Sequence, residues 1–226
     1  MTELPPLAIV VVTYKRTALA VETVRSFSML LDYPKELRQW YIADDGSPLD
    51  HMQAIFDELK LHGETLYGYH NEKFGENYNA GLGWNKGLVQ GHMISPIILF
   101  LEDDWQLRVK LDISPYVRLL IEREDVGIVR LGHLAVGSKV EIVGYDGIHY
   151  LNYLKETHYA YSGNPHLRHR RFSESYGMFM EDRNPGDMEL AMDAAFAAKE
   201  GPMIWRPADI PGWGCIGHMG TEKSWA

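Results

Sequence analysis

Three consecutive acidic residues, Glu102, Asp103 and Asp104, follow the apolar run PIILFL at residues 96–101. Neighbouring like charges repel, and beside a low-dielectric core water does not fully screen that repulsion. A bound cation would relieve it. Mg²⁺ and Mn²⁺ take oxygen ligands and usually combine one or two carboxylates with substrate phosphates. The triplet therefore predicts a divalent-metal site, with an ordinary solvated loop as the alternative.

Two further neighbouring carboxylates, Asp44 and Asp45, lie in the segment ADDGSP at residues 43–48. Gly46 and Pro48 favour a turn at this point. Either carboxylate could accept a hydrogen bond from the N–H edge of a base or from a ribose hydroxyl. An ordinary turn with an aspartate at a helix start is the alternative, and the sequence leaves both open.

The segment NEKFGENYNAGLGWNKGL at residues 71–88 has helical spacing but contains several glycines. Gly81, Gly83 and Gly87 each cost about 1 kcal/mol relative to alanine in a helix interior. Such a helix needs the close approach of a neighbouring backbone or of a ligand. Tight packing on a sheet explains Gly87, but it does not explain the polar residues Asn77, Asn79 and Asn85.

A basic cluster, Arg168, Arg170 and Arg171, lies beside aromatic residues in HLRHRRF at residues 166–172. It could bind an anionic acceptor such as a nucleic acid, in which an enzyme acting on a modified base must flip or bend the strand. The donor diphosphate, an acidic glycan or a plain solvated loop are the alternatives. The net charge of -9 argues against a general nucleic-acid binder, which needs many phosphate contacts.

The totals describe a globular chain of one domain, with 226 residues of which 46% are apolar. The single cysteine, Cys215, rules out an internal disulfide and fits a reducing compartment. No apolar run is long enough to span a bilayer, so we expect a cytoplasmic protein. The sequence contains no GxGxxG or GxxxxGK[ST] loop and nothing that resembles a Ser-His-Asp site.

The elements that would position these residues are short strands alternating with amphipathic helices. Strands are predicted at residues 7–12, 39–43, 65–70 and 96–101, with helices between them. This order predicts a parallel sheet covered on both faces. Ligands bind such sheets beyond the carboxyl ends of the strands, where the polar segments of this chain follow.

The second half differs in pattern. A helix is predicted at residues 114–124, a strand at 126–134 and a hairpin with a GYDG turn at 140–154. Residues 159–177 read as irregular, and a last helix is predicted at 187–198.

Together these segments resemble the GT-A glycosyltransferases, especially their large inverting family. The likeness rests on IVVVTYKR, on DDGS and on the acidic triplet, which stands where the family has its DxD motif but begins with Glu102. It implies a Rossmann-like, mostly parallel central sheet with helices on both faces and a smaller C-terminal acceptor-side subregion. Residues 1–226 would form one domain, with the donor half at 1–110 and the acceptor and catalytic-base half at 111–226.

The resemblance also implies roles for individual residues. The residues that would bind the nucleotide sugar are Thr13, Tyr14, Arg16, Asp44, Asp45, Lys73, Asn79, Asp103 and Lys223. The residues that would hold the metal are Asp103, Asp104 and His218. The general base would be Asp187 or Glu189, which point about 200° apart on a helix. Of these two we favour Asp187, because it follows the turn NPG at the helix start.

The expected activity is transfer of a sugar from a UDP or GDP sugar to an acceptor hydroxyl, with Mn²⁺ or Mg²⁺ and with inversion. The acceptor would be a modified DNA base, a glycan or a protein. A nucleotidyltransferase acting on sugar phosphates is one alternative, although TYKRTALAV lacks the glycines that its first loop would need. A non-catalytic module that binds sugar nucleotides is the other.

Overall fold

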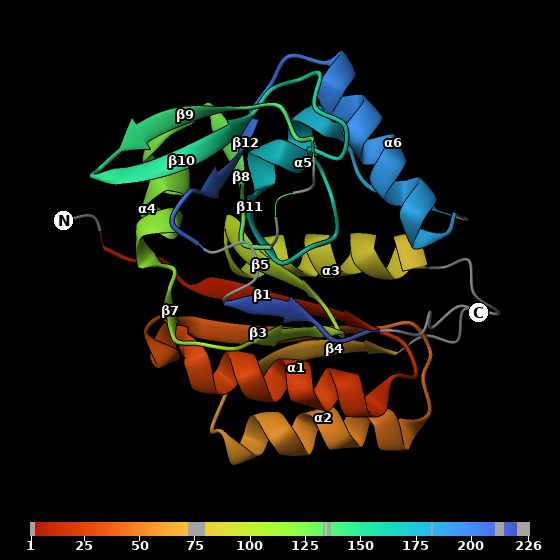
Figure 1. Cartoon of the computed structure of the whole chain (residues 1–226). Helices are drawn as coiled ribbons and strands as arrows, with labels where there is room; N and C mark the ends of the chain where they lie inside the picture. The colour runs from red at the N-terminus through yellow and green to blue at the C-terminus, as the bar shows by residue number, and fades with distance from the viewer. Residues whose placement is uncertain are drawn as a thin grey trace.

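The centre of the molecule is a twisted sheet of nine strands, in the order β4-β3-β1-β5-β11-β8-β12-β10-β9 (Figure 1). The computed structural model describes residues 3–71, 80–132, 134, 137–181, 183–210 and 215–220. The strands of this sheet are β1 (Leu7–Thr13), β3 (Arg38–Asp44), β4 (Leu66–Asn71), β5 (Ile97–Glu102), β8 (Val126–Arg130), β9 (Val140–Tyr145), β10 (Ile148–Tyr153), β11 (His166–His169) and β12 (Met203–Pro207).

Two short strand pairs and six helices complete the described fold. The pairs are β2 (Leu31–Asp32) with β7 (Leu111–Asp112), and β6 (Trp105–Leu107) with β13 (Ile216–His218). The helices are α1 (Thr17–Leu30), α2 (Leu49–Leu61), α3 (Ala80–Ile94), α4 (Ser114–Glu122), α5 (Arg170–Tyr176) and α6 (Pro185–Ala198), with one 3₁₀ turn at Lys35–Leu37.

The strands β4, β3, β1 and β5 are parallel to one another. Within the described residues, β11 and β10 run opposite to the other strands of the large sheet. The predicted mostly parallel sheet with helices on both faces is therefore confirmed.

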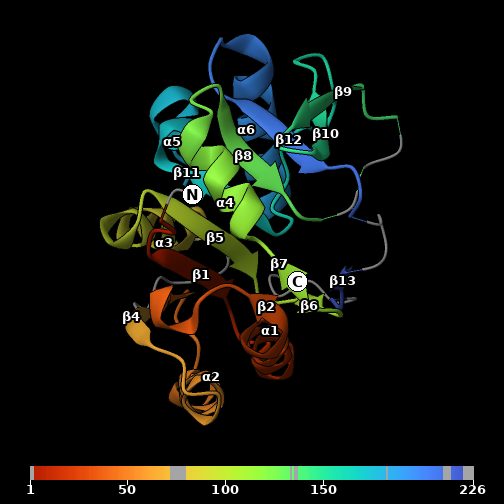
Figure 2. The ribbon, with the colours of Figure 1, turned by 90° about the vertical axis from the view of Figure 1, so that its left-hand side faces the viewer.

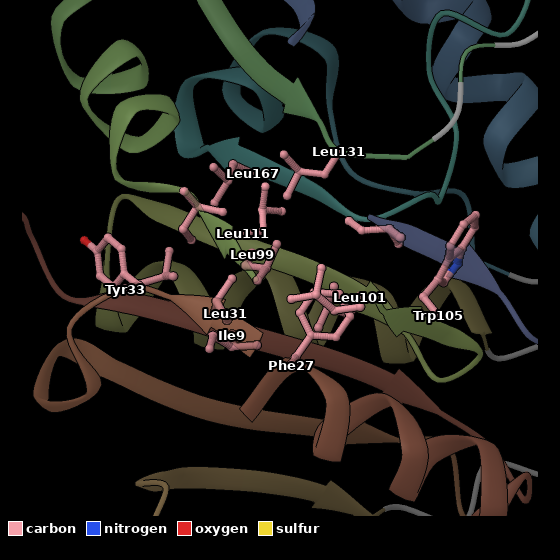
Figure 3. Packing of buried hydrophobic residues seen from close by; sticks show 14 of the residues in the cluster. Ile9, Phe27, Leu31, Tyr33, Leu99, Leu101, Trp105, Leu111, Leu131 and Leu167 are labelled. Carbon is pink, nitrogen blue, oxygen red and sulfur yellow. The ribbon is translucent and has the colours of Figure 1, made fainter. Parts of the chain in front are cut away.

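The core has two layers, one on each face of the sheet, because alternate residues of a strand point to opposite faces. In β1, Ile9 belongs to the layer that contains residues of α1, α2 and α4, whereas Val10 belongs to the layer that contains residues of α3, α5 and α6. Figure 3 shows the first layer, to which β1, β5 and β11 contribute Ile9, Leu99 and Leu167. In Figure 1, α1 and α2 lie on one side of β1 and α3 lies on the other.

The predicted strands of the first half are confirmed to within a residue or two at each end, and the helix predicted between the first two strands is α1. The predicted hairpin is confirmed as β9 and β10. Its turn places Asp146 and Gly147 at φ 48° and 76°, and two residues of positive φ match the right-handed twist of the flanking strands.

The interpretation of residues 159–177 as irregular is wrong for its second part. This part forms β11 and α5, and β11 pairs with β5 on one side and with β8 on the other. Histidine and arginine side chains hide a buried strand in a sequence pattern, because such strands are usually apolar.

The two halves of the chain share the one large sheet, since β11 of the second half pairs with β5 of the first. Figure 2 shows α1 and α2 at one end of the molecule and α5 and α6 at the other. Among the described helices, none combines the length and apolar character needed to cross a membrane.

Candidate functional site

A pocket opens at the carboxyl ends of β1, β3 and β5, between the beginnings of α3 and α6. The described residues that line it are Val12, Thr13, Tyr14, Arg16, Ala43, Asp45, Ala80, Gly83, Trp84, Glu102, Asp103 and Pro185. Polar residues that are up to 90 positions apart thus meet at the sheet edge that the strand order predicts. Lys73, Asn79 and Lys223, which the sequence also assigned to this site, lie outside the described residues.

Asp103 is buried and held by the end of β1. Its Oδ2 accepts hydrogen bonds from Thr13 Oγ1 at 2.7 Å and from the Tyr14 N–H at 3.2 Å, and its Oδ1 accepts one from Arg16. Burial raises the pKa of Asp103 to about 6, although Arg16 and Thr13 oppose the shift. Both carboxylate oxygens are therefore occupied by donors of the chain itself.

Asp104 lies between the end of β1 and the tail of the chain. Its Oδ2 is 2.6 Å from Arg16 Nη1 and 3.2 Å from His218 Nε2. The pairing of β13 with β6, in which His218 faces Trp105, brings this histidine to the site. Burial acts to raise the pKa of Asp104, but the opposing effects of His218 and Arg16 together lower it.

Asp104 and His218, which lie beside the pocket residue Arg16, fit a divalent cation. Asp104 Oδ1 is buried and has no hydrogen-bond partner among the described residues, so the side chain has an unused acceptor beside an imidazole. No three His, Cys, Asp or Glu residues of the described chain form a complete metal cage. A site of one or two carboxylates that a diphosphate completes is the usual arrangement for such cations.

Asp44 and Asp45 have different surroundings. Asp44 is fully buried, and its Oδ2 accepts hydrogen bonds from the N–H groups of Gly46 (3.1 Å) and Ser47 (2.9 Å). Asp45 lines the pocket, and its Oδ1 has no partner among the described residues. Burial, and then the neighbouring Asp44, raise the pKa of Asp45 to about 6. Asp44 thus builds the turn, and Asp45 faces the pocket.

A buried histidine that the sequence did not single out, His51 of α2, supports the end of β1. Its Nε2 is 3.0 Å from Thr13 Oγ1 and its Nδ1 is 3.0 Å from Thr17 Oγ1. The hydroxyl hydrogen of Thr13 goes to Asp103. His51 Nε2 must therefore donate to Thr13, which leaves Nδ1 as the acceptor for Thr17. Burial lowers the pKa of His51, which fits this neutral ring.

The two candidate bases at the start of α6 point in different directions, as the helical repeat predicts. Asp187 is exposed and accepts a hydrogen bond from Asn184 Nδ2 at 2.7 Å, while Asn184 caps the helix. Glu189 points inward and accepts a hydrogen bond from the Gly163 N–H. A Cβ at Gly163 would lie 2.9 Å from Glu189 Oε1 and 3.1 Å from Glu102 Cδ. Glu189 and Glu102 therefore meet over Gly163.

This neighbourhood raises the proton affinity of both glutamates. Burial raises the pKa of Glu189, although the Gly163 N–H and the charge of Arg130 oppose the shift. Burial also raises the pKa of Glu102 well above its usual value, and the charges of Asp104 and Glu189 add to the effect.

The glycines of α3 serve two purposes. A Cβ at Gly87 would lie 2.8 Å from Val10 Cγ1, and one at Gly91 would lie 2.7 Å from Val10 Cγ2, so both glycines let the helix approach the sheet. A Cβ at Gly83 would meet nothing nearer than Asp45, at 4.0 Å across the pocket. Asn85 makes two hydrogen bonds with the backbone of Phe179, which accounts for one polar residue of this helix.

The predicted anion-binding cluster is wrong for Arg168 and Arg171. Arg168 has no exposed surface, and its guanidinium donates to Ser173 Oγ and lies 4.9 Å from the ring centre of Phe172. The guanidinium of Arg171 donates to the backbone carbonyls of Leu120, Arg123 and Val126. Arg170 alone stays exposed, and one arginine does not make a phosphate-binding surface.

No protein-family model matches the chain, and no curated protein matches its sequence. Solved structures match its fold. GalNAc-T7 with UDP, GalNAc and Mn²⁺ has a TM-score of 0.66 at 12% identity, over 100% of this chain and 46% of that one. S. aureus TarS 1-349 has a TM-score of 0.62 at 14% identity, over 88% of this chain and 59% of that one.

A third match is the mannosyltransferase PcManGT from Pyrobaculum calidifontis, in complex with GDP-Man and Mn²⁺, with a TM-score of 0.60 at 16% identity, over 95% of this chain and 59% of that one. The chain therefore has the GT-A fold of these glycosyltransferases. It spans between 46% and 59% of the length of these three chains.

Proposed function

We propose that this protein is a metal-dependent glycosyltransferase that moves a sugar from a UDP or GDP sugar to an acceptor hydroxyl with inversion. The observation that carries the proposal is the pocket, where Asp45 at the end of β3 and Glu102 and Asp103 at the end of β5 meet Thr13 and Arg16 at the end of β1. Structures of the same fold are described with UDP-GlcNAc (TarS), with GDP-Man and Mn²⁺ (PcManGT), and with UDP and Mn²⁺ (GalNAc-T7).

The donor nucleotide would lie along the ends of β1 and β3. Asp45 lines the pocket, and its Oδ1, which has no partner among the described residues, would accept a hydrogen bond from a base N–H or a ribose hydroxyl. Thr13 and Tyr14 form the adjoining wall and hold Asp103 in place. The Asp103 carboxylate, whose oxygens already accept hydrogen bonds from the chain, would shape the pocket more than it would bind metal.

The cation would be held by Asp104 and His218, and Mn²⁺ suits this pair better than Mg²⁺, which strongly prefers oxygen ligands. When bound, it would neutralise charge on the diphosphate as that group leaves. Arg16, which lines the same pocket, would add a positive charge of the chain near the diphosphate.

We assign the general base to Glu189 in place of Asp187. A base must lie beside the donor and keep appreciable proton affinity. Glu189 is half-buried next to Glu102, which lines the pocket, and burial raises its pKa, so it would meet both conditions. In a single displacement, the acceptor oxygen bonds to the anomeric carbon while the bond from that carbon to the diphosphate breaks. The acceptor proton passes to a Glu189 carboxylate oxygen, and the nucleoside diphosphate leaves from the opposite face.

The test is a donor screen with Mn²⁺. The chain is incubated with UDP and GDP sugars, alone and with glycans, peptides and DNA carrying hydroxymethylated bases, and the nucleoside diphosphate released is measured by chromatography. The proposal is supported if nucleoside diphosphate is released only with Mn²⁺ present. EDTA should abolish this release, and the Asp104→Asn variant should not show it. Asp57→Asn, a change of the same type on the exposed face of α2, is the matched control and should keep full activity. If no nucleotide sugar is hydrolysed or transferred, the proposal fails.

A further inference from the structure

Arg16 forms an ion pair with both aspartates of the acidic triplet. Its Nη1 is 2.6 Å from Asp104 Oδ2, and its Nη2 contacts Asp103 Oδ1. The Arg16 side chain is 19% exposed, and the side chains of Asp103 and Asp104 are 2% and 7% exposed. The repulsion between these neighbouring acids is thus relieved by a cation that the chain itself supplies.

The backbone before Arg16 is arranged to aim it there. Lys15 has a φ of 61°, an uncommon conformation for a residue with a long side chain. Its N–H donates to Ser47 Oγ at 2.8 Å, which ties this turn to the end of β3. The Thr17 N–H donates to the Lys15 carbonyl at 3.0 Å and closes the turn at the start of α1. This conformation sets Arg16 over the acidic pair.

The contact conflicts with the role of Asp104 in the proposed function. The guanidinium and His218 share the Oδ2 oxygen of Asp104, so Arg16 stands on the side of the carboxylate that faces the second metal ligand. A cation held by Asp104 and His218 would lie close to the guanidinium and repel it.

We infer that Arg16 is an internal counter-ion that competes with the divalent cation for Asp104 and transfers to the donor diphosphate when the cation binds. The inference rests on the proposed function. Arg16 lines the pocket, so the guanidinium can leave Asp104 without leaving the site. There it can form paired hydrogen bonds with phosphate oxygens, for which the guanidinium geometry is well suited.

This exchange makes the cation and the nucleotide bind cooperatively. A cation that binds alone displaces the guanidinium from its contacts with Asp103 and Asp104. When a nucleoside diphosphate is also present, the displaced guanidinium gains a new anionic partner. Each ligand therefore strengthens binding of the other by the same factor, as linkage requires.

The test measures binding and does not use sugar transfer. Mn²⁺ affinity is measured by electron paramagnetic resonance of the free ion and by calorimetry, with and without UDP or GDP. For the wild-type chain we expect the nucleotide to tighten Mn²⁺ binding about fivefold or more. Arg16→Gln should bind Mn²⁺ alone roughly tenfold more tightly, because a charge-assisted contact no longer competes, and the nucleotide should add little.

Two further variants separate competition from charge and from folding. Lys15→Gln removes a positive charge from the neighbouring residue. The Lys15 ammonium lies 4.5 Å from the Tyr14 ring centre, so this variant should leave Mn²⁺ affinity nearly unchanged. Arg16→Lys keeps the charge without the two-pronged contact and should give an intermediate affinity. It also carries the test if Arg16→Gln fails to fold, which circular dichroism would show.

The outcomes distinguish this inference from the proposed function. If Arg16→Gln, or Arg16→Lys in its place, binds Mn²⁺ no more tightly than the wild type, or if Lys15→Gln gains as much, the competition is refuted and the metal site stands. If the wild-type chain binds no Mn²⁺ even with UDP or GDP, the metal-dependent function and this inference both fail.

Discussion

The carboxylates around the pocket are chemically alike, and their neighbours decide what each can do. Asp44 is fully buried and its Oδ2 holds the turn that follows β3, whereas Asp45 lines the pocket with an oxygen that has no partner among the described residues. Asp103 is occupied by the end of β1, and Asp104 is shared between Arg16 and His218. A carboxylate oxygen that already accepts hydrogen bonds from the chain is less available to a ligand.

The choice between Glu189 and Asp187 is testable with paired amides. Glu189→Gln keeps the shape of the side chain and removes the proton acceptor, so kcat should fall about 10²–10⁴-fold with little change in donor affinity. Asp187→Asn should keep nearly normal kcat, because Asp187 is exposed and bonded to Asn184. Steady-state kinetics and calorimetry with the donor measure both effects. A large loss of kcat in Asp187→Asn with a near-normal Glu189→Gln would reverse the assignment.

Asp45 should make stability depend on pH in a definite direction. Its pKa is raised from 3.8 to about 6 by burial and by Asp44, so the folded chain binds a proton between these values that the unfolded chain does not. The stabilisation from this proton is present at low pH and is lost as pH rises through about 6.

We therefore expect the melting temperature to fall less between pH 5 and pH 7 in Asp45→Asn than in the wild type, because the amide does not titrate. Thermal melts of both chains across this range, in one ionic strength and without nucleotide, check the expectation. Parallel pH profiles in the two chains would show that Asp45 titrates near its ordinary value.

At the residue scale, the sequence predicts well which residues lie together at the pocket. It predicts poorly which role each of them has. Strand order alone brings Thr13, Asp45 and Asp103 to one edge. The orientation of Glu189 depends on the Gly163 N–H, 26 residues earlier in the chain. The support that His51 gives to Thr13 depends on how α2 packs, and no spacing rule predicts it.

At the scale of elements, the clearest limit of the sequence is β11. The strand HLRH lies between β5 and β8, so each of its edges is paired. Leu167 enters the core on one face, while Arg168 enters the other face among aromatic rings. A buried arginine is rare because a charge is costly to remove from water. The same residues that suggested a binding surface therefore concealed a central strand.

Gly87 allows α3 to pack closely on the sheet, and this gives a prediction about stability. Gly87→Ala would put a methyl group 2.8 Å from Val10 Cγ1 and 3.3 Å from Ala43 Cβ. Overpacking of this kind typically costs about 1–3 kcal/mol of the free energy of unfolding, and the better helix propensity of alanine offsets about 1 kcal/mol at most. Urea unfolding should show a net loss of stability.

Gly83→Ala is the matched control on the same helix. Its methyl group would meet nothing nearer than 4.0 Å and should cost no stability. It would instead narrow the pocket opposite Asp45, so nucleotide affinity should fall in calorimetry with Mn²⁺ present. A destabilised Gly83→Ala, or a Gly87→Ala as stable as the wild type, would contradict this account of the helix.

At the scale of the whole molecule, residues 1–110 and residues 111–226 are joined through the middle of one sheet. The pairing of β5 with β11 crosses between them, and the apolar layer in Figure 3 is continuous from Ile9 through Leu99 to Leu167. The predicted boundary near residue 110 therefore does not mark a break in the core. A sheet and core that continue across such a boundary favour a single cooperative unfolding transition.

Arg168 tests this continuity, because it sits on the strand that joins the two halves and contacts the second core layer. Arg168→Ala should leave a cavity beside Phe172 and reduce the free energy of unfolding by about 2–4 kcal/mol. Arg168→Met keeps most of the volume and removes a charge that no described carboxylate pairs with, so it should be near neutral or stabilising. Urea unfolding followed by tryptophan fluorescence and by far-ultraviolet circular dichroism should give one coincident transition in all three chains. Separate transitions in Arg168→Ala would show that the halves fold independently. If Arg168→Met is as unstable as Arg168→Ala, the loss of stability comes from removing the charge and not from the lost packing.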